Sequence, residues 1–201
     1  IANELYLKKL IVGGYEGVYE FAKDFRNEGM DKSHNPEFTM LEIYVAYKDY
    51  NWMMDYTEKI FKQVVHNILK QDIVSFGKHK LDFKKPFRRV SMTEILKEKT
   101  GEDILDLDKI KLKKLCKKYK IEVQNDWAEG KMINSLFDAT CEQDIIQPTF
   151  ITDYPKIMSP LCKTHRLNSK LSERFELFIG GMEIANAYSE LNDPIDQRER
   201  F

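Results

Sequence analysis

The sequence has 201 residues, of which 42% are hydrophobic and 32% are charged, a composition typical of folded globular proteins rather than of disordered chains. Lys and Arg number 32 against 33 Asp and Glu, so the chain lacks the overall basic charge of a non-specific nucleic-acid binder, and any contact with RNA must be local. No apolar run approaches the roughly 20 residues that a transmembrane helix needs. The length predicts one domain, or one domain that carries an insertion.

Three cysteines, Cys116, Cys141 and Cys162, lie far apart in the sequence and form no CxxC pair. This spacing argues against a disulfide framework and against a zinc site, and a reducing cytoplasm is the simplest expected location. The chain opens without Met or a signal peptide and stops at Phe201 in what reads as the middle of an element. We therefore expect a fragment of a longer protein.

The first quarter of the chain predicts a helix followed by two strands. Residues 4–12 have apolar positions at helical spacing and are followed by two glycines, a pattern typical of a helix end. Residues 17–25 and 38–47 are rich in β-branched and aromatic side chains, which favours a pair of antiparallel strands. The segment between them, roughly 29–36, is too long for a tight turn and contains Gly, Asp, Ser, Asn and Pro, so we expect a long functional loop.

Outside the central part of the chain, the pattern predicts one long helix and further strands. From Trp52 onward, apolar residues recur at helical spacing over about five turns. Residues 82–89 and 147–151 favour short strands. The runs 174–179 and 182–188 predict a hairpin, because the glycine pair between them supplies the positive φ angles that a tight turn needs.

A helical segment interrupts this pattern. Ser91 and Glu94 form a capping box that opens a short helix, and two more helices are predicted over 108–120 and 131–142. We interpret residues 88–142 as a small helical insertion, so the expected fold class is α+β, with an antiparallel sheet and flanking helices. The second of these helices contains seven lysines; a solvated helix face is the ordinary interpretation, and contact with RNA phosphates is the alternative.

Charged side chains are concentrated in FRNEGMDKSHNPEFTMLE, residues 25–42. Strand alternation places Arg26 and Glu28 on one face of the first strand, and Glu42 and Tyr44 on one face of the second. If the strands pair, these groups share a surface that cannot be an ordinary core face, because unpaired buried charge is too costly. An exposed face with scattered ion pairs is the alternative.

The C-terminal hairpin carries a second polar cluster, formed by Glu176, Glu183, Asn186, Tyr188 and Glu190. The last three recur at every second position and so share one strand face. Glu183 is out of phase with Asn186, so a bulge or a strand start must lie between them if both point inward. Glutamates close together in a protein interior need a cation such as Mg²⁺ or a ligand ammonium group. A solvated acidic hairpin is the alternative, although apolar neighbours such as Ile184 suggest a substantially buried strand.

The stretch 25–42 resembles the second signature motif of class II aminoacyl-tRNA synthetases, in the form that lysyl-tRNA synthetases use. The stretches IANELYLKKLIVGGYEGVYEF and ERFELFIGGMEIANAYSELNDPIDQRERF resemble the same family. The resemblance covers nearly the whole chain and is weaker over 70–145. It implies the antiparallel sheet of the class II catalytic core. The family's first motif, its last glycine-rich motif and its anticodon-binding domain have no counterpart in the sequence.

This resemblance implies an ATP site. By resemblance, Arg26 is the catalytic residue that holds the α-phosphate and the substrate carboxylate, where a fixed cation stabilises charge that builds up on phosphorus. Glu28 would contact the adenine amino group, His34 the distal phosphates, and Phe38 would stack on adenine. Glu183 also belongs to the implied ATP-binding set.

The resemblance further implies a bound Mg²⁺ ion that offsets the charge of the phosphates. Glu176 and Glu183 match the carboxylates that hold this metal. Asn186 would orient the substrate carboxylate.

A lysine pocket is implied as well. Glu4 matches the position that holds the α-amino group of the amino acid. Glu42, Tyr44 and Glu190 would meet the ε-ammonium group, and Tyr188 would wall the aliphatic stem. Carboxylates left unpaired without a cation penalise uncharged substrates, so such a pocket can reject apolar analogues.

The implied activity is the activation of L-lysine with ATP to lysyl-adenylate, followed by transfer to tRNA-Lys. The tRNA would bind mainly through the anticodon-binding domain, and the parent enzyme would be a cytoplasmic homodimer with no membrane contact. We expect the 201 residues alone to be inactive.

Three alternatives remain open. Aspartyl- and asparaginyl-tRNA synthetases share the FRNE and PEFT pattern but lack a glutamate where Glu190 stands, and an acidic pocket would repel aspartate. A paralogue of lysyl-tRNA synthetase that attaches lysine to an elongation factor shares the lysine-activating core. A non-catalytic module that holds RNA or a protein would use the basic helix instead.

Overall fold

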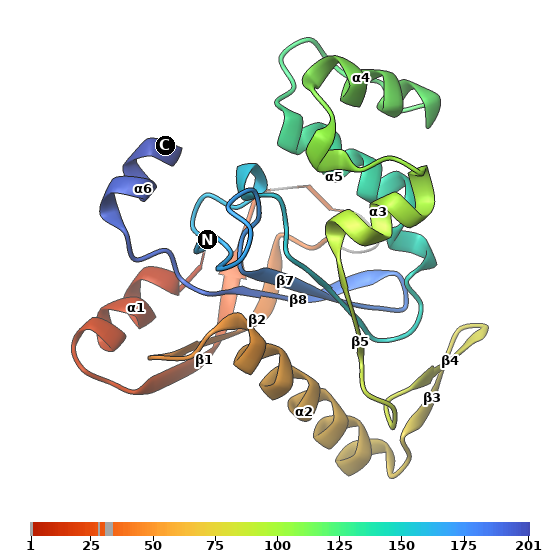
Figure 1. Ribbon diagram of the computed structural model, residues 1–201. Helices are drawn as coiled ribbons and strands as arrows, with labels where there is room; N and C mark the ends of the chain where they lie inside the picture. Colours follow the sequence, from red (N-terminus) through yellow and green to blue (C-terminus); the bar gives the residue numbers. More distant parts are fainter. Residues whose placement is uncertain (1, 28, 31–33) are drawn as a thin grey trace. The chain divides into compact units, whose positions relative to one another are not determined.

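The computed structural model describes residues 2–27, 29–30 and 34–201 and divides into two compact units between Lys48 and Asp49 (Figure 1). Its helices are α1 (Glu4–Val12), α2 (Tyr50–Leu69), α3 (Met92–Thr100), α4 (Lys109–Lys118), α5 (Glu129–Thr140) and α6 (Pro194–Arg200), with single-turn helices η1 (Ile104–Asp106), η2 (Glu142–Asp144) and η3 (Lys156–Met158). Its strands are β1 (Gly17–Phe25), β2 (Glu37–Val45), β3 (Ile73–Phe76), β4 (His79–Asp82), β5 (Arg88–Ser91), β6 (Thr149–Thr152), β7 (Arg174–Ile179) and β8 (Met182–Tyr188). In the described part of the chain, no helix is long and apolar enough to cross a membrane.

The first unit consists of helix α1 and the antiparallel hairpin β1–β2. The predicted helix at 4–12 and the predicted strand at 17–25 are confirmed, and β2 lies at Glu37–Val45, within two residues of its predicted limits. Leu7 on the helix and Ala22 on β1 are buried, so the helix packs on the hairpin through small and medium apolar side chains.

The second unit is built on a four-stranded sheet with the order β5-β6-β7-β8. β6, β7 and β8 are antiparallel, as predicted, whereas β5 and β6 run parallel. Parallel neighbours need a crossover connection of a dozen or more residues, and helices α3 to α5 supply it. The segment predicted as an insertion, 88–142, therefore begins with a strand of this sheet. Helices on an antiparallel-rich sheet confirm the α+β class.

Two cores cover the two faces of this sheet. Phe150, Phe175 and Leu177 pack with Tyr50 and Met54 of α2 on one face. Their neighbours in sequence point the other way, where apolar side chains of the sheet pack with α3, α4 and α5: Val90, Ile151, Phe178, Leu96, Leu112 and Phe137. Figure 1 shows the three helices on one side of β7 and β8 and α2 on the other.

The helical segment begins and ends as the sequence predicted. The Ser91 hydroxyl oxygen accepts from the Glu94 N–H at 3.1 Å, and the Glu94 carboxylate accepts from the Ser91 N–H at 3.0 Å, which completes the capping box. Helix α3 ends at Gly101, whose φ is +79°. Helix α4 begins after Asp108, whose carboxylate accepts from the Lys111 N–H at 2.8 Å. Helix α5 begins and ends two residues before its predicted limits.

The strand predicted at 82–89 is wrong. β4 ends at Asp82 and β5 begins at Arg88. The Asp82 carboxylate accepts from the Lys84 N–H at 2.9 Å, a local bond that favours a turn over an extended chain. Pro86 cannot donate to a strand ladder, so the chain stays irregular up to Arg88.

Hairpin β7–β8 closes on Gly180 and Gly181, whose φ angles of +65° and +77° confirm the predicted turn. The expectation that β8 is substantially buried is wrong: the side chain of Ile184 is 42% exposed. The physical reason is the position of β8 at the edge of the sheet, where alternate apolar side chains lose their neighbours on one side.

Candidate functional site

The β1–β2 register aligns the polar residues predicted for the first unit. Asp24 lies opposite Phe38 and Val18 opposite Tyr44, and the Arg26 N–H donates to the Pro36 carbonyl at 3.0 Å, which extends the ladder by one residue. Because opposite residues share a face, Arg26, Phe38, Glu42 and Tyr44 lie on the same face of the hairpin. Two further predicted residues belong to the connection: His34 precedes β2, and Glu28 lies outside the described residues.

Two contacts organise this hairpin face. The Arg26 guanidinium carbon lies 5.1 Å from the centre of the Phe38 ring, within the range of a cation–π interaction. Further along β2, the Tyr44 hydroxyl donates to Oε2 of Glu42 at 2.9 Å. One end of the face therefore presents a fixed cation beside an aromatic ring, and the other end a carboxylate with a phenol.

Helix α1 brings another predicted carboxylate to the first unit. Glu4 lies in the first turn of α1, and Lys8 Nζ donates to its Oε1 at 2.5 Å. The same ammonium group is 5.8 Å from the centre of the Tyr44 ring. Lys8 thus links Glu4 to the phenol that bonds Glu42. Three of the four residues predicted to meet the two amino groups of lysine therefore lie near one another within this unit, and the fourth, Glu190, belongs to the second unit.

A bulge in β8 aligns the polar cluster of the second unit. Leu177 of β7 pairs with Ala185, but the next residue, Phe178, pairs with Glu183, so Ile184 is an extra residue in β8. Of the two alternatives predicted between Glu183 and Asn186, a bulge or a strand start, the structure has the bulge. It brings Glu183 onto the sheet face that also carries Glu176 and Asn186, because one added residue reverses the alternation.

Glu176 is the centre of this cluster, with 9% of its surface exposed. The Tyr154 hydroxyl donates to its Oε2 at 2.6 Å, the Arg174 guanidinium donates to Oε1, and the Asn186 amide donates to Oε1 at 3.3 Å. Arg174 Nε also donates to the side-chain amide oxygen, Oδ1, of Asn186 at 3.2 Å. These bonds fix the carboxylate of Glu176 and the orientation of the Asn186 amide.

The remaining carboxylates of this face repel one another. Desolvation and the nearby Glu176 carboxylate raise the pKa of Glu183 to about 7. The same two causes, in the same order, raise the pKa of Glu142. Desolvation and the charges of Glu142 and Glu176 raise the pKa of Asp138 to about 6. Excess negative charge at this point of the fold favours a bound cation.

Four members of this cluster were missed from the sequence. In the helix predicted over 131–142, the four-residue spacing of Asp138 and Glu142 would have put both on one face; in the structure Asp138 lies in the last turn of α5 and Glu142 is the first residue of η2. Arg174 lies two residues before Glu176 and so on the same strand face, a signal that the sequence contained. Tyr154 lies in an irregular loop, and no local pattern pointed to it.

Two predicted residues occupy the end of β8. Tyr188 lies opposite Arg174 in the register and on the same face as Asn186. Glu190 lies two residues past the end of β8, where its backbone pairs with Cys162 in an isolated bridge. The structure thus brings Glu176, Glu183, Asn186 and Tyr188 onto one face, whereas Glu190 follows this face outside the β7–β8 ladder.

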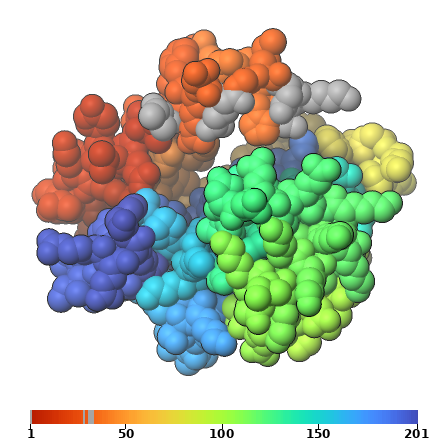
Figure 2. Space-filling view, turned by 90° about the horizontal axis from the view of Figure 1, so that it is seen from above, coloured from red at the N-terminus to blue at the C-terminus, as the bar shows by residue number. Residues whose placement is uncertain are grey.

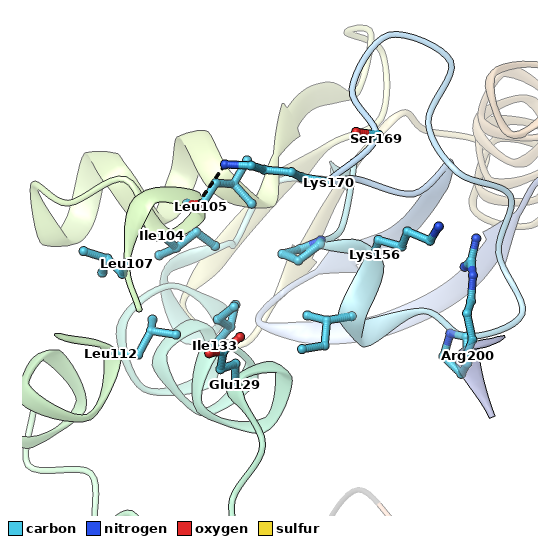
Figure 3. A pocket seen from close by; sticks show the side chains of 13 residues that line it. Ile104, Leu105, Leu107, Leu112, Glu129, Ile133, Lys156, Ser169, Lys170 and Arg200 are labelled. Atoms are coloured by element: carbon cyan, nitrogen blue, oxygen red, sulfur yellow. Dashed lines mark hydrogen bonds between the residues drawn. The ribbon is translucent and has the colours of Figure 1, made fainter. Parts of the chain in front are cut away.

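A separate hollow in the second unit contains none of the predicted site residues. Its apolar wall includes Ile104, Leu112 and Ile133, and its rim carries Lys156, Lys170 and Arg200 (Figure 3). Lys170 Nζ donates to the Leu105 carbonyl at 3.3 Å, so the hollow marks a junction between the helical segment and the loop that precedes β7.

The chain belongs to the class II tRNA synthetases, since the family model described as "tRNA synthetases class II (D, K and N)" matches residues 1–201. Similar curated proteins are named "Lysine--tRNA ligase". The chain is 58% identical to one from Porphyromonas gingivalis and 59% identical to one from Christiangramia forsetii, in each case over all 201 residues and 35% of the relative's length. It is 55% identical to a third, from Azobacteroides pseudotrichonymphae, and spans 40% of that protein. The chain therefore spans little more than a third of the curated relatives that it matches.

Proposed function

We propose that this chain forms the ATP- and lysine-binding part of a lysine–tRNA ligase, which activates L-lysine with ATP and transfers it to tRNA-Lys. Identities of 55–59% to relatives with that name support the proposal. The observation that carries it is the hairpin face of the first unit, on which Arg26 and Phe38 occupy one end and the hydrogen-bonded pair Glu42 and Tyr44 the other.

The length of this face suits an extended two-part substrate. Pro36, whose carbonyl accepts from the Arg26 N–H, directly precedes β2 and lies six residues before Glu42, which corresponds to ~20 Å at the rise of an antiparallel strand. The cationic end would take the phosphates and the adenine, and the anionic end the ammonium group of the amino acid. One rigid strand would thus set the distance between the end that binds the nucleotide and the end that recognises the ammonium group.

The proposed reaction needs no protein nucleophile. The lysine carboxylate attacks the α-phosphorus of ATP, a new P–O bond forms, and the bond to pyrophosphate breaks. Negative charge builds up on the α-phosphoryl oxygens in the transition state, where the guanidinium of Arg26 would stabilise it. Asn186, oriented by Arg174, would hold the attacking carboxylate.

The carboxylates of the second unit fit a Mg²⁺ ion, which would offset the charge of the phosphates when ATP is bound. Mg²⁺ is commonly held by one or two carboxylates together with substrate phosphates and water. Within the described residues, no three His, Cys, Asp or Glu side chains form a complete metal cage. We therefore propose Glu176 and Glu183 as the two protein ligands, with Glu176 held in place by Tyr154 and Arg174.

Selection of lysine would rest on charge. Glu42 and Glu190 would meet the ε-ammonium group, Glu4 the α-amino group, and Tyr188 the aliphatic stem. An amino acid without a terminal cation would leave desolvated carboxylates unpaired, which costs binding free energy. A carboxylate side chain, as in aspartate, would be repelled.

The proposal extends to tRNA-Lys as acceptor and to a homodimeric protein. Incubation of the protein in its full length with lysine, ATP and either tRNA-Lys or an elongation factor separates the ligase from its paralogue. Lysine transferred to tRNA supports the ligase, and lysine transferred to the factor alone supports the paralogue.

The substitution Glu42→Gln tests the lysine pocket. It keeps the shape of the side chain and removes the charge, so we expect the KM for lysine in ATP–pyrophosphate exchange to rise by about tenfold or more, since a hydrogen-bonded charge pair contributes ~1.5–3 kcal/mol. Glu37→Gln is the matched control, because Glu37 lies on the same strand but on its opposite face. Equal KM values for lysine in both variants would contradict the assignment.

A further inference from the structure

Helix α4 presents a dense positive surface. Lys109, Lys111, Lys113, Lys114, Lys117, Lys118 and Lys120 are all exposed, whereas Leu112, Leu115 and Cys116 face the core. The segment 109–120 contains no Asp or Glu, although the whole chain has a net charge of −1. The remaining residues together are therefore acidic, and positive charge is concentrated on this helix. We call these seven side chains the α4 lysine surface.

The lysines of this surface are not neutralised by the protein. Elsewhere in the helical segment, exposed lysines form ion pairs with carboxylates. Lys97 Nζ lies 3.3 Å from Oδ2 of Asp103, and Lys99 Nζ lies 2.6 Å from Oδ2 of Asp144. Within the part of the chain that the structure describes, no lysine of the α4 surface has an ion pair, and Lys113 donates instead to the neutral Asn125 amide at 3.3 Å. A solvated helix face usually mixes both signs of charge.

The spacing of these lysines disfavours the isolated helix. Lys109, Lys113 and Lys117 follow one another at four-residue intervals, and like charges at this spacing repel. Lys113, Lys117 and Lys120 also line a hollow, together with the apolar side chains of Ile121 and Val123 and a single carboxylate, Glu122. Charges that repel one another along a concave surface are well placed to contact a polyanion, which would relieve the repulsion.

The α4 lysine surface lies on the same side of the sheet as the candidate metal ligands. Helix α4 packs on α5, where the Cys116 thiol donates to the Met132 carbonyl at 3.7 Å. Helix α5 in turn borders the metal site, because the charge of Glu176 acts on Asp138 near its end. Two helix layers of about 8–10 Å each therefore separate the lysines from the sheet face. Figure 2 shows the helical segment, in green, as one continuous mass beside the cyan and blue segments of the same unit.

We propose that the α4 lysine surface binds the phosphate backbone of the tRNA while its acceptor end reaches the adenylate. The proposal rests on the proposed ligase function, which requires a tRNA end at this face of the sheet. A duplex RNA stem carries a regular array of phosphates and is bound mainly through such charges rather than through its bases. The partner is RNA, since it is the polyanion that the reaction itself brings to this face.

The test is a triple charge reversal, Lys113→Glu, Lys117→Glu and Lys120→Glu, in the full-length protein. We expect the KM for tRNA-Lys in aminoacylation to rise by about tenfold or more. The negative slope of log affinity against log salt should become shallower by roughly two to three, since each lost phosphate contact removes about 0.9. Lysine-dependent ATP–pyrophosphate exchange, measured without tRNA, should stay within about twofold of the unchanged protein. The triple variant Lys78→Glu, Lys80→Glu and Lys84→Glu makes the same charge change elsewhere in the second unit and should leave both activities unchanged.

A neutral triple variant and a direct titration of tRNA complete the test. The neutral variant Lys113→Gln, Lys117→Gln and Lys120→Gln avoids new ion pairs and should show the same shift in a smaller size. Direct titration of labelled tRNA-Lys, followed by fluorescence anisotropy, reports on the surface even if the protein activates no lysine, so failure of this inference is distinct from failure of the ligase proposal. The proposal is overturned if both triple variants at 113, 117 and 120 keep the tRNA affinity and salt slope of the unchanged protein. It is also overturned if the control triple at 78, 80 and 84 loses as much tRNA affinity as they do.

Discussion

The hydroxyl of Tyr154 donates a hydrogen bond of 2.6 Å to Oε2 of Glu176, and both side chains are buried. Arg174 joins them, since its guanidinium carbon lies 4.6 Å from the centre of the Tyr154 ring and its Nη2 donates to Oε1 of Glu176. Burial and the Glu176 charge hold the pKa of Tyr154 well above its ordinary value, so the phenol keeps its proton. An irregular loop thereby fixes a carboxylate of the sheet in one position.

The substitution Tyr154→Phe should therefore weaken both stability and metal-dependent activity. A buried carboxylate oxygen that loses its donor costs about 1–3 kcal/mol, which corresponds to a Tm lower by roughly 2–12 °C for a domain of this size. Thermal unfolding of the protein with and without Mg²⁺ measures the effect. Tyr119→Phe is the control, because its hydroxyl donates to the Lys99 carbonyl at an exposed position. Equal Tm values for the two variants would contradict the role of Tyr154.

Asp138 should make stability depend on pH. Desolvation, Glu142 and Glu176 raise its pKa from 3.8 to about 6. The folded state thus holds a proton more tightly than the unfolded state, and this contribution to stability is present below pH 3.8 and is lost as the pH rises through about 6. We expect Asp138→Asn to become progressively more stable than the unchanged protein between pH 4 and 7.

Parallel thermal unfolding at several pH values checks this expectation. Asp106→Asn changes another carboxylate of the same segment, one that lies near Lys170 rather than near other carboxylates, and should show no such trend. A difference in Tm between Asp138→Asn and the unchanged protein that stays constant from pH 4 to 7 is the result that would rule out the electrostatic account.

Gly180 tests the turn that positions β8. A Cβ at Gly180 would lie 2.8 Å from the Phe76 ring, whereas a Cβ at Gly181 would lie 3.6 Å from its nearest neighbour, and both residues have positive φ. Both alanine variants should lose about 1 kcal/mol through backbone strain, and Gly180→Ala should lose more than Gly181→Ala, because the partly exposed Phe76 ring must shift to make room for the Cβ. Chemical denaturation measures the difference, and equal losses would show that the Phe76 contact has no energetic role.

Arg26 tests the catalytic assignment. Arg26→Lys keeps the positive charge but loses the planar fork that can contact two oxygens at once. We expect the rate of lysine-dependent ATP–pyrophosphate exchange to fall by about 10²-fold or more, as when a group that stabilises developing charge is lost. Arg88→Lys, at an exposed ion pair with Glu98, is the control. An Arg26→Lys protein with a nearly unchanged rate would mean that Arg26 acts only as a diffuse charge.

Local signals predicted much of the fold. Helix α1, strand β1 and both strands of the β7–β8 hairpin have the predicted limits, because glycines at their ends and clear apolar periodicity define them. The β3–β4 hairpin was missed, although its two-residue connection contains Gly77 with a φ of +55°. The parallel pairing of β5 with β6 could not be read from the sequence, since it depends on strands about 60 residues apart and on the crossover between them.

The candidate site was predictable where a single strand or hairpin defines it. Alternation placed Arg26, Glu42 and Tyr44 on one face of a paired hairpin, and the phase of Glu183 required a bulge or a strand start before Asn186. Contacts made across the fold were not predictable, because Tyr154 and Asp138 reach Glu176 from a loop and a helix that no local pattern connects to β7. The roles of these residues in ATP and lysine binding stay predictions.

The central proposal is that the protein to which this chain belongs activates lysine, and the most direct test compares amino acids. ATP–pyrophosphate exchange by the full-length protein is measured with lysine, aspartate or asparagine as the only amino acid, since the matched family includes enzymes for all three. The account predicts exchange with lysine that exceeds exchange with either of the others by at least about 10³-fold, because a site built for a charged group rejects substrates that lack it. Exchange driven by aspartate or asparagine, or no exchange with any of the three, would contradict it.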